Sequence, residues 1–148
     1  EYNARLGDPE AMNVLPLLES DFVDICNGIV EGNLHQKDIS FRNQATVCKY
    51  AVPEGYPDSP VKGEPIDVSA ITDTSQLYYA SVDVKNGQLT EAGSRTVAYV
   101  GLADTLGEAE AKAETEISRV RGPLFHRTDI GTAQLIQLRI NHLKSIRS

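Results

Sequence analysis

The chain has 148 residues, of which 14 are Lys or Arg and 21 are Asp or Glu, which gives a formal net charge of -7 without a basic stripe. Phosphate contacts dominate nucleic-acid binding, so an acidic chain of this kind is not expected to bind nucleic acid. Neither a run of about 20 apolar residues nor a charged-then-apolar leader pattern occurs, which predicts no membrane association and a cytoplasmic location.

The first ten residues, EYNARLGDPE, begin with alternating polar and apolar side chains. In an extended strand this alternation places Glu1, Asn3 and Arg5 on one face, so that an acid, an amide and a guanidinium lie side by side. The Gly-Asp-Pro-Glu that follows is typical of a turn that opens a helix, with Asp8 as the cap.

A helix is predicted over residues 16–34, with Ser20 as its N-cap and Gly32-Asn33 as its end. Its apolar stripe consists of Phe22, Ile25, Cys26, Ile29 and Val30. The polar residues that follow look like a crossing segment. We therefore expect one domain to end at residue 38 and a second to occupy residues 39–148.

The second domain is expected to be rich in β-strands. Strands are predicted over residues 45–52 and 77–84, and the Asn86-Gly87 pair is a strong signal for a hairpin turn. The returning strand should lie within residues 88–102, with Val97, Tyr99 and Gly101 on one side. Between the first two strands, residues 54–66 carry several prolines and glycines and should form an ordered, turn-rich loop.

Two helices are expected to flank this sheet, near residues 105–121 and 132–146. Thr105 and Glu108 fit a capping box at the start of the first helix. Its buried face should consist of Leu106, Ala109, Ala113, Ile117 and Val120, and that of the last helix of Leu135, Ile136, Leu138, Leu143 and Ile146. The fold class is therefore predicted to be α+β.

Cysteine and histidine show no spacing that is typical of a metal site. Cys26 and Cys48 are isolated thiols without a second pair, so we expect both to be reduced and buried.

Several segments resemble, in order, the phosphoribosylamine–glycine ligases (glycinamide ribonucleotide synthetases) of the ATP-grasp superfamily. The opening EYNARLGDPE resembles the metal-binding strand and following turn of that family. The later matches are LPLLESDFVDICNGIVEGNL, ATVCKYAVPEGYP with Lys62-Gly63, GQLTEAGSRTVAYVGLADTLGEAEAKA and FHRTDIG. A single E-x-N-x-R would be weak evidence, whereas five ordered matches with fitting gaps are specific.

The resemblance implies that the chain is the C-terminal third of a longer enzyme. Residues 1–38 would end an ATP-grasp domain, and residues 39–148 would form a small, antiparallel, β-rich C-terminal domain. The implied reaction joins glycine to 5-phosphoribosylamine through glycyl phosphate, with ATP converted to ADP and phosphate, in purine biosynthesis. The amine-substrate domain and the glycine-rich loop over the nucleotide would lie upstream, so the isolated chain is expected to be inactive.

The resemblance also assigns roles to the first strand. Glu1 and Asn3 would bind Mg²⁺ or Mn²⁺, since these cations prefer carboxylate and amide oxygens. Arg5 would hold the transferring phosphate or the oxyanion of the second step.

Three further residues are candidates for substrate binding. Asp8 and Glu10 could accept the ammonium group of glycine, although an Asp before Pro-Glu is more often a helix cap. Arg95 could reach the nucleotide or the substrate, and the alternative is a surface ion pair. Gly93-Ser94-Arg95 stands where the family commonly has two glycines before arginine, and Tyr79-Ala80-Ser81 where His-Ala-Gly is usual, so roles in this region are carried over with less support.

Two alternatives stay open. The chain could belong to another ATP-grasp carboxylate–amine ligase or carboxylase, because that superfamily reuses the metal strand and a similar β-rich tail. It could also be a non-catalytic docking module or carrier, but the hairpin tip Val84-Lys85-Asn86-Gly87 lacks the Met or Ala that flank a carrier lysine.

Overall fold

The computed structural model describes residues 6–147, which divide into one unit that ends at Gln44 and a second that begins at Ala45. The second unit combines helices with antiparallel sheet, which confirms the α+β class. The boundary expected after residue 38, and the assignment of the preceding residues to an ATP-grasp domain, stay predictions.

In the first unit, residues 6–44 form two short α-helices and two 3-10 turns. They are α1 (Glu10–Val14), a 3-10 turn at Leu15–Leu17, α2 (Phe22–Val30) and a second 3-10 turn at Leu34–Gln36. Helix α2 confirms the helix predicted within residues 16–34 and its end before Gly32, but Leu15–Leu17 forms a separate 3-10 turn, because the chain leaves the helical conformation at Leu18.

The N-cap of α2 is Asp21 and not Ser20. The Asp21 carboxylate accepts hydrogen bonds from the backbone N–H groups of Val23 (2.7 Å) and Asp24 (3.1 Å). The Ser20 hydroxyl instead accepts a hydrogen bond from the N–H of Ser40 at 2.9 Å and so ties down the segment after α2. Both residues are good caps by type, so their sequence alone does not decide between them.

The apolar stripe of α2 is mostly exposed within the first unit. Val30 retains 86% of its accessible surface, and Phe22 and Ile29 are also exposed. Cys26 on this helix is exposed and Cys48 in the second unit is buried, both as free thiols, so the prediction of burial is right only for Cys48.

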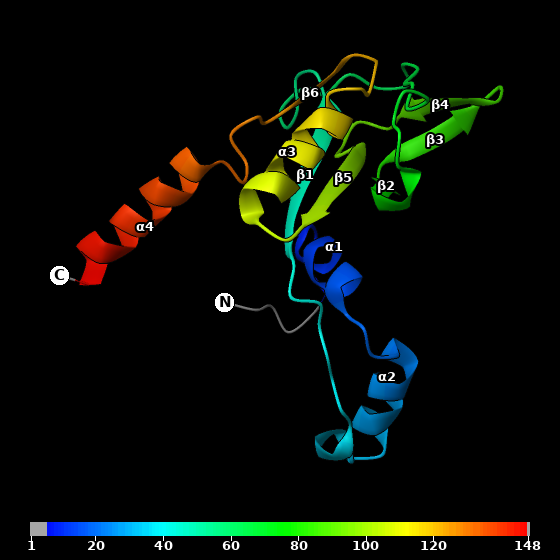
Figure 1. Ribbon diagram of the computed structural model, residues 1–148. Coiled ribbons are helices and arrows are strands. Elements are labelled where there is room, and N and C mark those ends of the chain that lie inside the picture. Colours follow the sequence, from blue (N-terminus) through cyan, green and yellow to red (C-terminus); the bar gives the residue numbers. More distant parts are fainter. Residues whose placement is uncertain (1–5, 148) are drawn as a thin grey trace. The chain divides into compact units, whose positions relative to one another are not determined.

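A four-stranded antiparallel sheet forms the centre of the second unit (Figure 1). Its strands, in spatial order, are β2 (Leu77–Tyr79), β5 (Val97–Ala103), β1 (Ala45–Pro53) and β6 (Leu124–His126). The long pairing of β1 with β5 runs from Ala45 opposite Ala103 to Ala51 opposite Val97. The strand predicted over residues 45–52 is thus confirmed, whereas β6 was not expected from the sequence.

The hairpin at Asn86-Gly87 is confirmed. It joins β3 (Val82–Lys85) to β4 (Gln88–Glu91), and both turn residues have positive φ, 51° and 77°. Positive φ at both positions is what a type I′ turn requires. However, the two strands expected over residues 77–84 and 88–102 are each divided between this hairpin and the larger sheet.

Helix α3 (Leu106–Ile117) covers β1 and β5 (Figure 1) and begins with the predicted capping box of Thr105 and Glu108. The hydrophobic core lies between this helix and the sheet. Its buried members are Val47, Ala51, Ile66, Ile71, Leu77, Val97, Tyr99, Ala103, Ala109, Ala113 and Ile117. Leu106 and Val120, expected on the buried face, lie at its margin, with Leu106 exposed and Val120 half-buried.

Helix α4 (Ala133–Arg147) forms close to the predicted bounds but has no buried residue. Leu138, Leu143 and Ile146 are exposed, and Leu135 and Ile136 are half-buried. The expectation that α4 buries all five within this chain is therefore wrong. Among residues 6–147, no helix is both long enough and apolar enough to cross a membrane.

The contact of α3 with β5 depends on Gly101. A methyl group at Gly101 would overlap the backbone oxygen of Ala109 and lie 2.8 Å from the backbone nitrogen of Ala113. Backbone atoms cannot move aside as a flexible side chain can. Only glycine therefore permits this close approach of helix and strand.

We predict that Gly101→Ala lowers the free energy of unfolding by about 3 kcal/mol, because α3 must shift away from β5. Gly107→Ala is the matched control, since a methyl group there meets nothing within 4 Å and alanine favours the first turn of α3. Urea unfolding of the two variants measures the difference. Equal stability of Gly101→Ala and Gly107→Ala would contradict the prediction.

Candidate functional site

The predicted metal ligands Glu1 and Asn3, together with Arg5, lie outside the described residues. Within residues 6–147, no group of three or more His, Cys, Asp or Glu side chains is arranged to hold a metal ion.

Asp8 and Glu10 belong to the first unit, at the start of α1. Pro9 is the N-cap residue of that helix, so the prediction of Asp8 at the N-cap position is wrong. The carboxylate of Glu10 folds back beside Gly7, where it occupies the space that a larger side chain would need. Gly7 therefore allows the acid of Glu10 to approach the backbone of the turn.

Arg95 belongs to the second unit, in the segment that joins β4 to β5. Its guanidinium carbon lies 5.5 Å from the centre of the Tyr50 ring, a distance typical of cation–π contact. Its carbonyl accepts a hydrogen bond from the N–H of Ser81 at 2.8 Å, and the N–H of the next residue, Thr96, donates to Ala51 at 3.0 Å. The peptide group that follows Arg95 is thus fixed at both ends, by Ser81 and by Ala51 of β1.

Arg95 is part of a feature that we call the cationic loop pair, which consists of residues 62–64 and 91–95. The two segments are held together by backbone hydrogen bonds, from Gly63 N–H to the Glu91 carbonyl (2.9 Å) and from Glu91 N–H to the Glu64 carbonyl (3.1 Å). The Glu91 side chain adds two more bonds, because its oxygens accept from the N–H groups of Glu64 (3.1 Å) and Gly93 (3.2 Å).

Lysine side chains lie against both glycines of the loop pair. A methyl group at Gly93 would lie 2.5 Å from Cε and 2.7 Å from Cγ of Lys62, so the stem of Lys62 crosses directly over Gly93. A methyl group at Gly63 would lie 3.4 Å from Nζ of Lys85. The loop pair thus carries two cations, Lys62 and Arg95, together with the carboxylates of Glu64 and Glu91, and Lys85 reaches it from β3. Guanidinium and ammonium groups on such loops are suited to bind an anionic group such as phosphate.

A second group of charged residues surrounds Lys49, whose side chain is fully buried. Its Nζ donates to Glu110 Oε1 (2.6 Å), to Glu114 Oε2 (2.5 Å) and to the carbonyl of Thr128 (3.0 Å). His126 Nε2 lies 3.0 Å from the other oxygen of Glu114. Burial alone raises the pKa of Glu114, but hydrogen bonds from Lys49 and His126 outweigh it and hold that pKa below its ordinary value. Because these groups satisfy one another, we assign the cluster a structural role.

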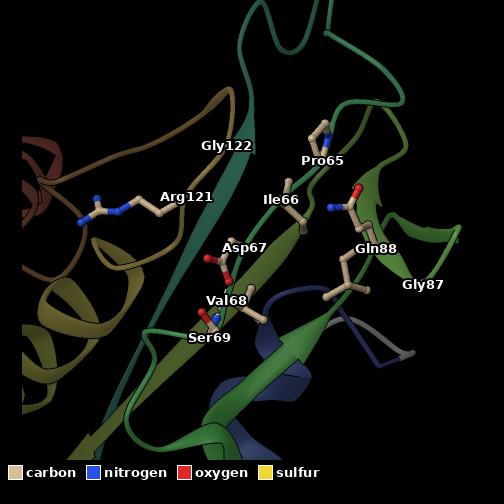
Figure 2. A pocket seen from close by; sticks show the side chains of 10 residues that line it. Pro65, Ile66, Asp67, Val68, Ser69, Gly87, Gln88, Arg121 and Gly122 are labelled. Atoms are coloured by element: carbon tan, nitrogen blue, oxygen red, sulfur yellow. Dashed lines mark hydrogen bonds between the residues drawn. The ribbon is translucent and has the colours of Figure 1, made fainter.

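Two hollows of the second unit each present a single cation. One, of about 580 Å³, has Lys112 beside the carboxylates of Asp73 and Glu116. The other, of about 540 Å³, lies beside Pro65–Ser69 and Gln88, with Arg121 and Gly122 on its other side (Figure 2). The backbone groups of Asp67 and Arg121 bond to each other at 2.9 Å, and Figure 2 shows the Arg121 guanidinium extending away from Ile66 and Val68. The cationic loop pair is therefore the better candidate site in the second unit.

Sequence reasoning found Arg95 but missed Glu91 and the burial of Lys49. Acidic and basic residues on strands are usually exposed, and nothing local marks these two as buried. The sequence marks Lys62 only as part of a family match, without a role. Gly93 has a positive φ of 85° and no side chain, which leaves room for the stem of Lys62, and only the Gly-Ser-Arg sequence hints at such a turn.

Comparison with known proteins identifies one family. The sequence model described as "Phosphoribosylglycinamide synthetase, C domain" matches residues 46–133. The phosphoribosylamine–glycine ligase of Methanocaldococcus jannaschii is 53% identical over 150 residues, which cover 99% of this chain and 34% of the relative. The enzyme of the same name from Methanosarcina barkeri is 52% identical over 147 residues, with the same coverage.

A solved structure gives the same result. The crystal structure of phosphoribosylamine–glycine ligase from Thermotoga maritima superposes with a TM-score of 0.65 and 29% identity, over 87% of this chain and 32% of that chain. The chain thus spans about a third of the length of the relatives it matches.

We predict that Lys49→Met lowers the free energy of unfolding by about 2 kcal/mol. This is less than is typical of fully buried pairs, because Glu110 and Glu114 keep some access to water. Lys112→Met is the control, since that lysine is exposed and donates to the carbonyl of Leu102. Urea unfolding should show the larger loss for Lys49→Met, and a loss no greater than that of the control would refute the structural role.

Proposed function

The chain belongs to the phosphoribosylglycinamide synthetase C-domain family, and from this we propose that it is the C-terminal part of a phosphoribosylamine–glycine ligase. The 53% identity to the Methanocaldococcus jannaschii enzyme, along 99% of this chain, supports the proposal most strongly. The enzyme would join glycine to 5-phosphoribosylamine, with ATP as co-substrate, in purine biosynthesis. The expected cytoplasmic location stays a prediction.

The proposal assigns different roles to the two ends of the chain. Residues 1–38 would complete an ATP-grasp domain, and residues 39–148 would form the small C-terminal domain. Because the chain spans about a third of its relatives, upstream domains of the same enzyme would supply most of the nucleotide site. We therefore expect the isolated chain to be inactive.

The proposed reaction has two steps. An oxygen of the glycine carboxylate attacks the γ-phosphorus of ATP, and the bond to ADP breaks, which gives glycyl phosphate. The nitrogen of 5-phosphoribosylamine then attacks the acyl carbon, inorganic phosphate leaves and a proton is lost from nitrogen. Arg5 would donate hydrogen bonds to the transferring phosphate and to the oxyanion of the second step. Asp8 or Glu10 would accept the ammonium group of glycine.

The donor chemistry of Glu1 and Asn3 fits a hard divalent cation. A carboxylate can bridge two ions and an amide carbonyl adds a neutral ligand, so these residues would hold Mg²⁺ or Mn²⁺. When bound, the cation would neutralise the charge of the phosphates.

The cationic loop pair would bind a phosphate group, either that of 5-phosphoribosylamine or those of ATP. Arg95 offers a planar fork of donors next to a peptide group that is fixed at both ends, and Lys62 adds charge across Gly93. This arrangement suits the recognition of phosphate oxygens better than a flexible surface lysine would.

The first test is ADP formation by the full-length enzyme that contains this chain. ADP should appear only when Mg-ATP, glycine and 5-phosphoribosylamine are all present, and Glu1→Ala should abolish it. If glycine can be omitted or replaced by another carboxylate without loss, the chain belongs to a different ATP-grasp ligase or carboxylase. If no combination yields ADP, the docking module becomes the better interpretation.

Arg95→Ala should raise the KM of one phosphate-bearing substrate by about tenfold, because a charge-assisted hydrogen bond is lost. Arg95→Lys keeps the charge without the fork and should lie between the wild type and Arg95→Ala. Arg121→Ala is the control, since its exposed side chain lies outside the loop pair and donates to the carbonyl of Ser118. The substrate whose KM changes identifies which phosphate is bound, and no change in either KM would remove Arg95 from the site.

A further inference from the structure

The cationic loop pair contains a buried carboxylate. Glu91, at the end of β4, is only 1% exposed, and both of its oxygens accept hydrogen bonds from backbone N–H groups of the loop pair. We propose that Glu91 is a positioning residue, which fixes the loop pair so that Arg95 and Lys62 meet the anionic group of the substrate. This inference rests on the function proposed above.

The bonding of Glu91 is specific to the two segments that carry the cations. One oxygen binds the N–H of Glu64, two residues after Lys62, and the other binds the N–H of Gly93, two residues before Arg95. The backbone of Glu91 bonds to Gly63 and Glu64 as well. A single residue thus sets the spacing between the loop of Lys62 and the loop of Arg95.

A carboxylate is the side chain that this arrangement requires. It has two acceptor oxygens and no donor, so it can bind two converging N–H groups at once. Glutamine has the same shape, but its NH₂ group would face one of these N–H groups. Glu91→Gln therefore removes one of the two bonds with the smallest possible change in volume.

The structure offers a matched control in Glu116. This residue is also buried, at 7% exposure, and its carboxylate accepts two hydrogen bonds from one loop residue, Thr72, through the N–H (2.8 Å) and the hydroxyl (2.6 Å). Glu116 holds the segment before β2 and makes no such bond to the loop pair. Glu116→Gln thus imitates the loss of stability without disturbing the segments that carry Lys62 and Arg95.

The experiment uses the full-length enzyme with Glu91→Gln, Glu116→Gln, Arg95→Ala and the double variant Glu91→Gln/Arg95→Ala. We expect Glu91→Gln to raise the KM of the substrate that Arg95→Ala affects by about fivefold, with kcat changed less than about twofold. Glu116→Gln should lower the urea midpoint but leave this KM unchanged. In the double variant, Glu91→Gln should add almost nothing to the effect of Arg95→Ala, because the residue that it positions is gone.

Several results would overturn the inference. The first is that the increases in KM caused by Glu91→Gln and Arg95→Ala multiply in the double variant. The second is that Glu116→Gln raises the KM as much as Glu91→Gln does. The third is that Glu91→Gln lowers the stability without any change of KM. If Glu91→Gln does not fold, Glu91→Asp replaces it. Aspartate keeps the charge but is too short to reach both N–H groups, so an unchanged KM would again refute the proposal.

Failure of this inference is distinguishable from failure of the proposed function. A wild-type enzyme that forms no ADP from the three substrates would overturn both. A wild-type enzyme that is active, with a clear effect of Arg95→Ala and an independent effect of Glu91→Gln, would overturn the positioning role alone.

Discussion

The second unit is organised around a positive charge that has no access to water. Lys49 lies on β1, in the middle of the sheet, and its side chain is fully buried. A buried ammonium group needs acceptors on every side, and these come from Glu110 and Glu114 on α3 and from the carbonyl of Thr128. The helix and the segment after β6 are therefore bound to the same atom of the central strand. Close packing at Gly101 complements this, because it lets the backbone of α3 approach β5.

Buried carboxylates have a corresponding role at the edges of the unit. Glu91 binds backbone N–H groups of two loops, and Glu116 binds the N–H and hydroxyl of Thr72. The Glu91 side chain supplements the backbone hydrogen bonds between its two loops, and the Glu116 side chain supplies acceptors to a loop that lies outside the strands. The loops are thereby fixed without being part of the sheet. Arg95 and Lys62 can then project from a rigid backbone, which is a better basis for phosphate recognition than a mobile loop.

Local signals in the sequence predicted the parts of the fold that local chemistry determines. Asn86-Gly87 marks the hairpin because both residues tolerate positive φ, and Thr105 with Glu108 marks the start of α3 because each caps the other's free N–H.

Predictions of strand bounds and of burial failed where the structure depends on contacts between residues far apart in the sequence. The strands near residues 77–84 and 88–102 break because their halves pair with different neighbours, and no local residue announces the break. The Lys49 cluster joins residues more than 60 positions apart, such as Lys49 and Glu110 at a separation of 61, so its burial could not be inferred from the strand pattern.

The lengths of the strands also bear on solubility during folding and storage. The two outer strands of the four-stranded sheet, β2 and β6, have three residues each, whereas the inner strands β5 and β1 have seven and nine. Exposed strand edges are templates for pairing with other chains, and a short edge offers few free N–H and carbonyl groups for it. The inner strands are paired on both sides only over short stretches, where β6 lies beside Ala51–Pro53 of β1 and β2 lies beside Val97–Tyr99 of β5. The rest of each inner strand has a ladder partner on one side only, so these stretches are where edge-to-edge association between molecules would start.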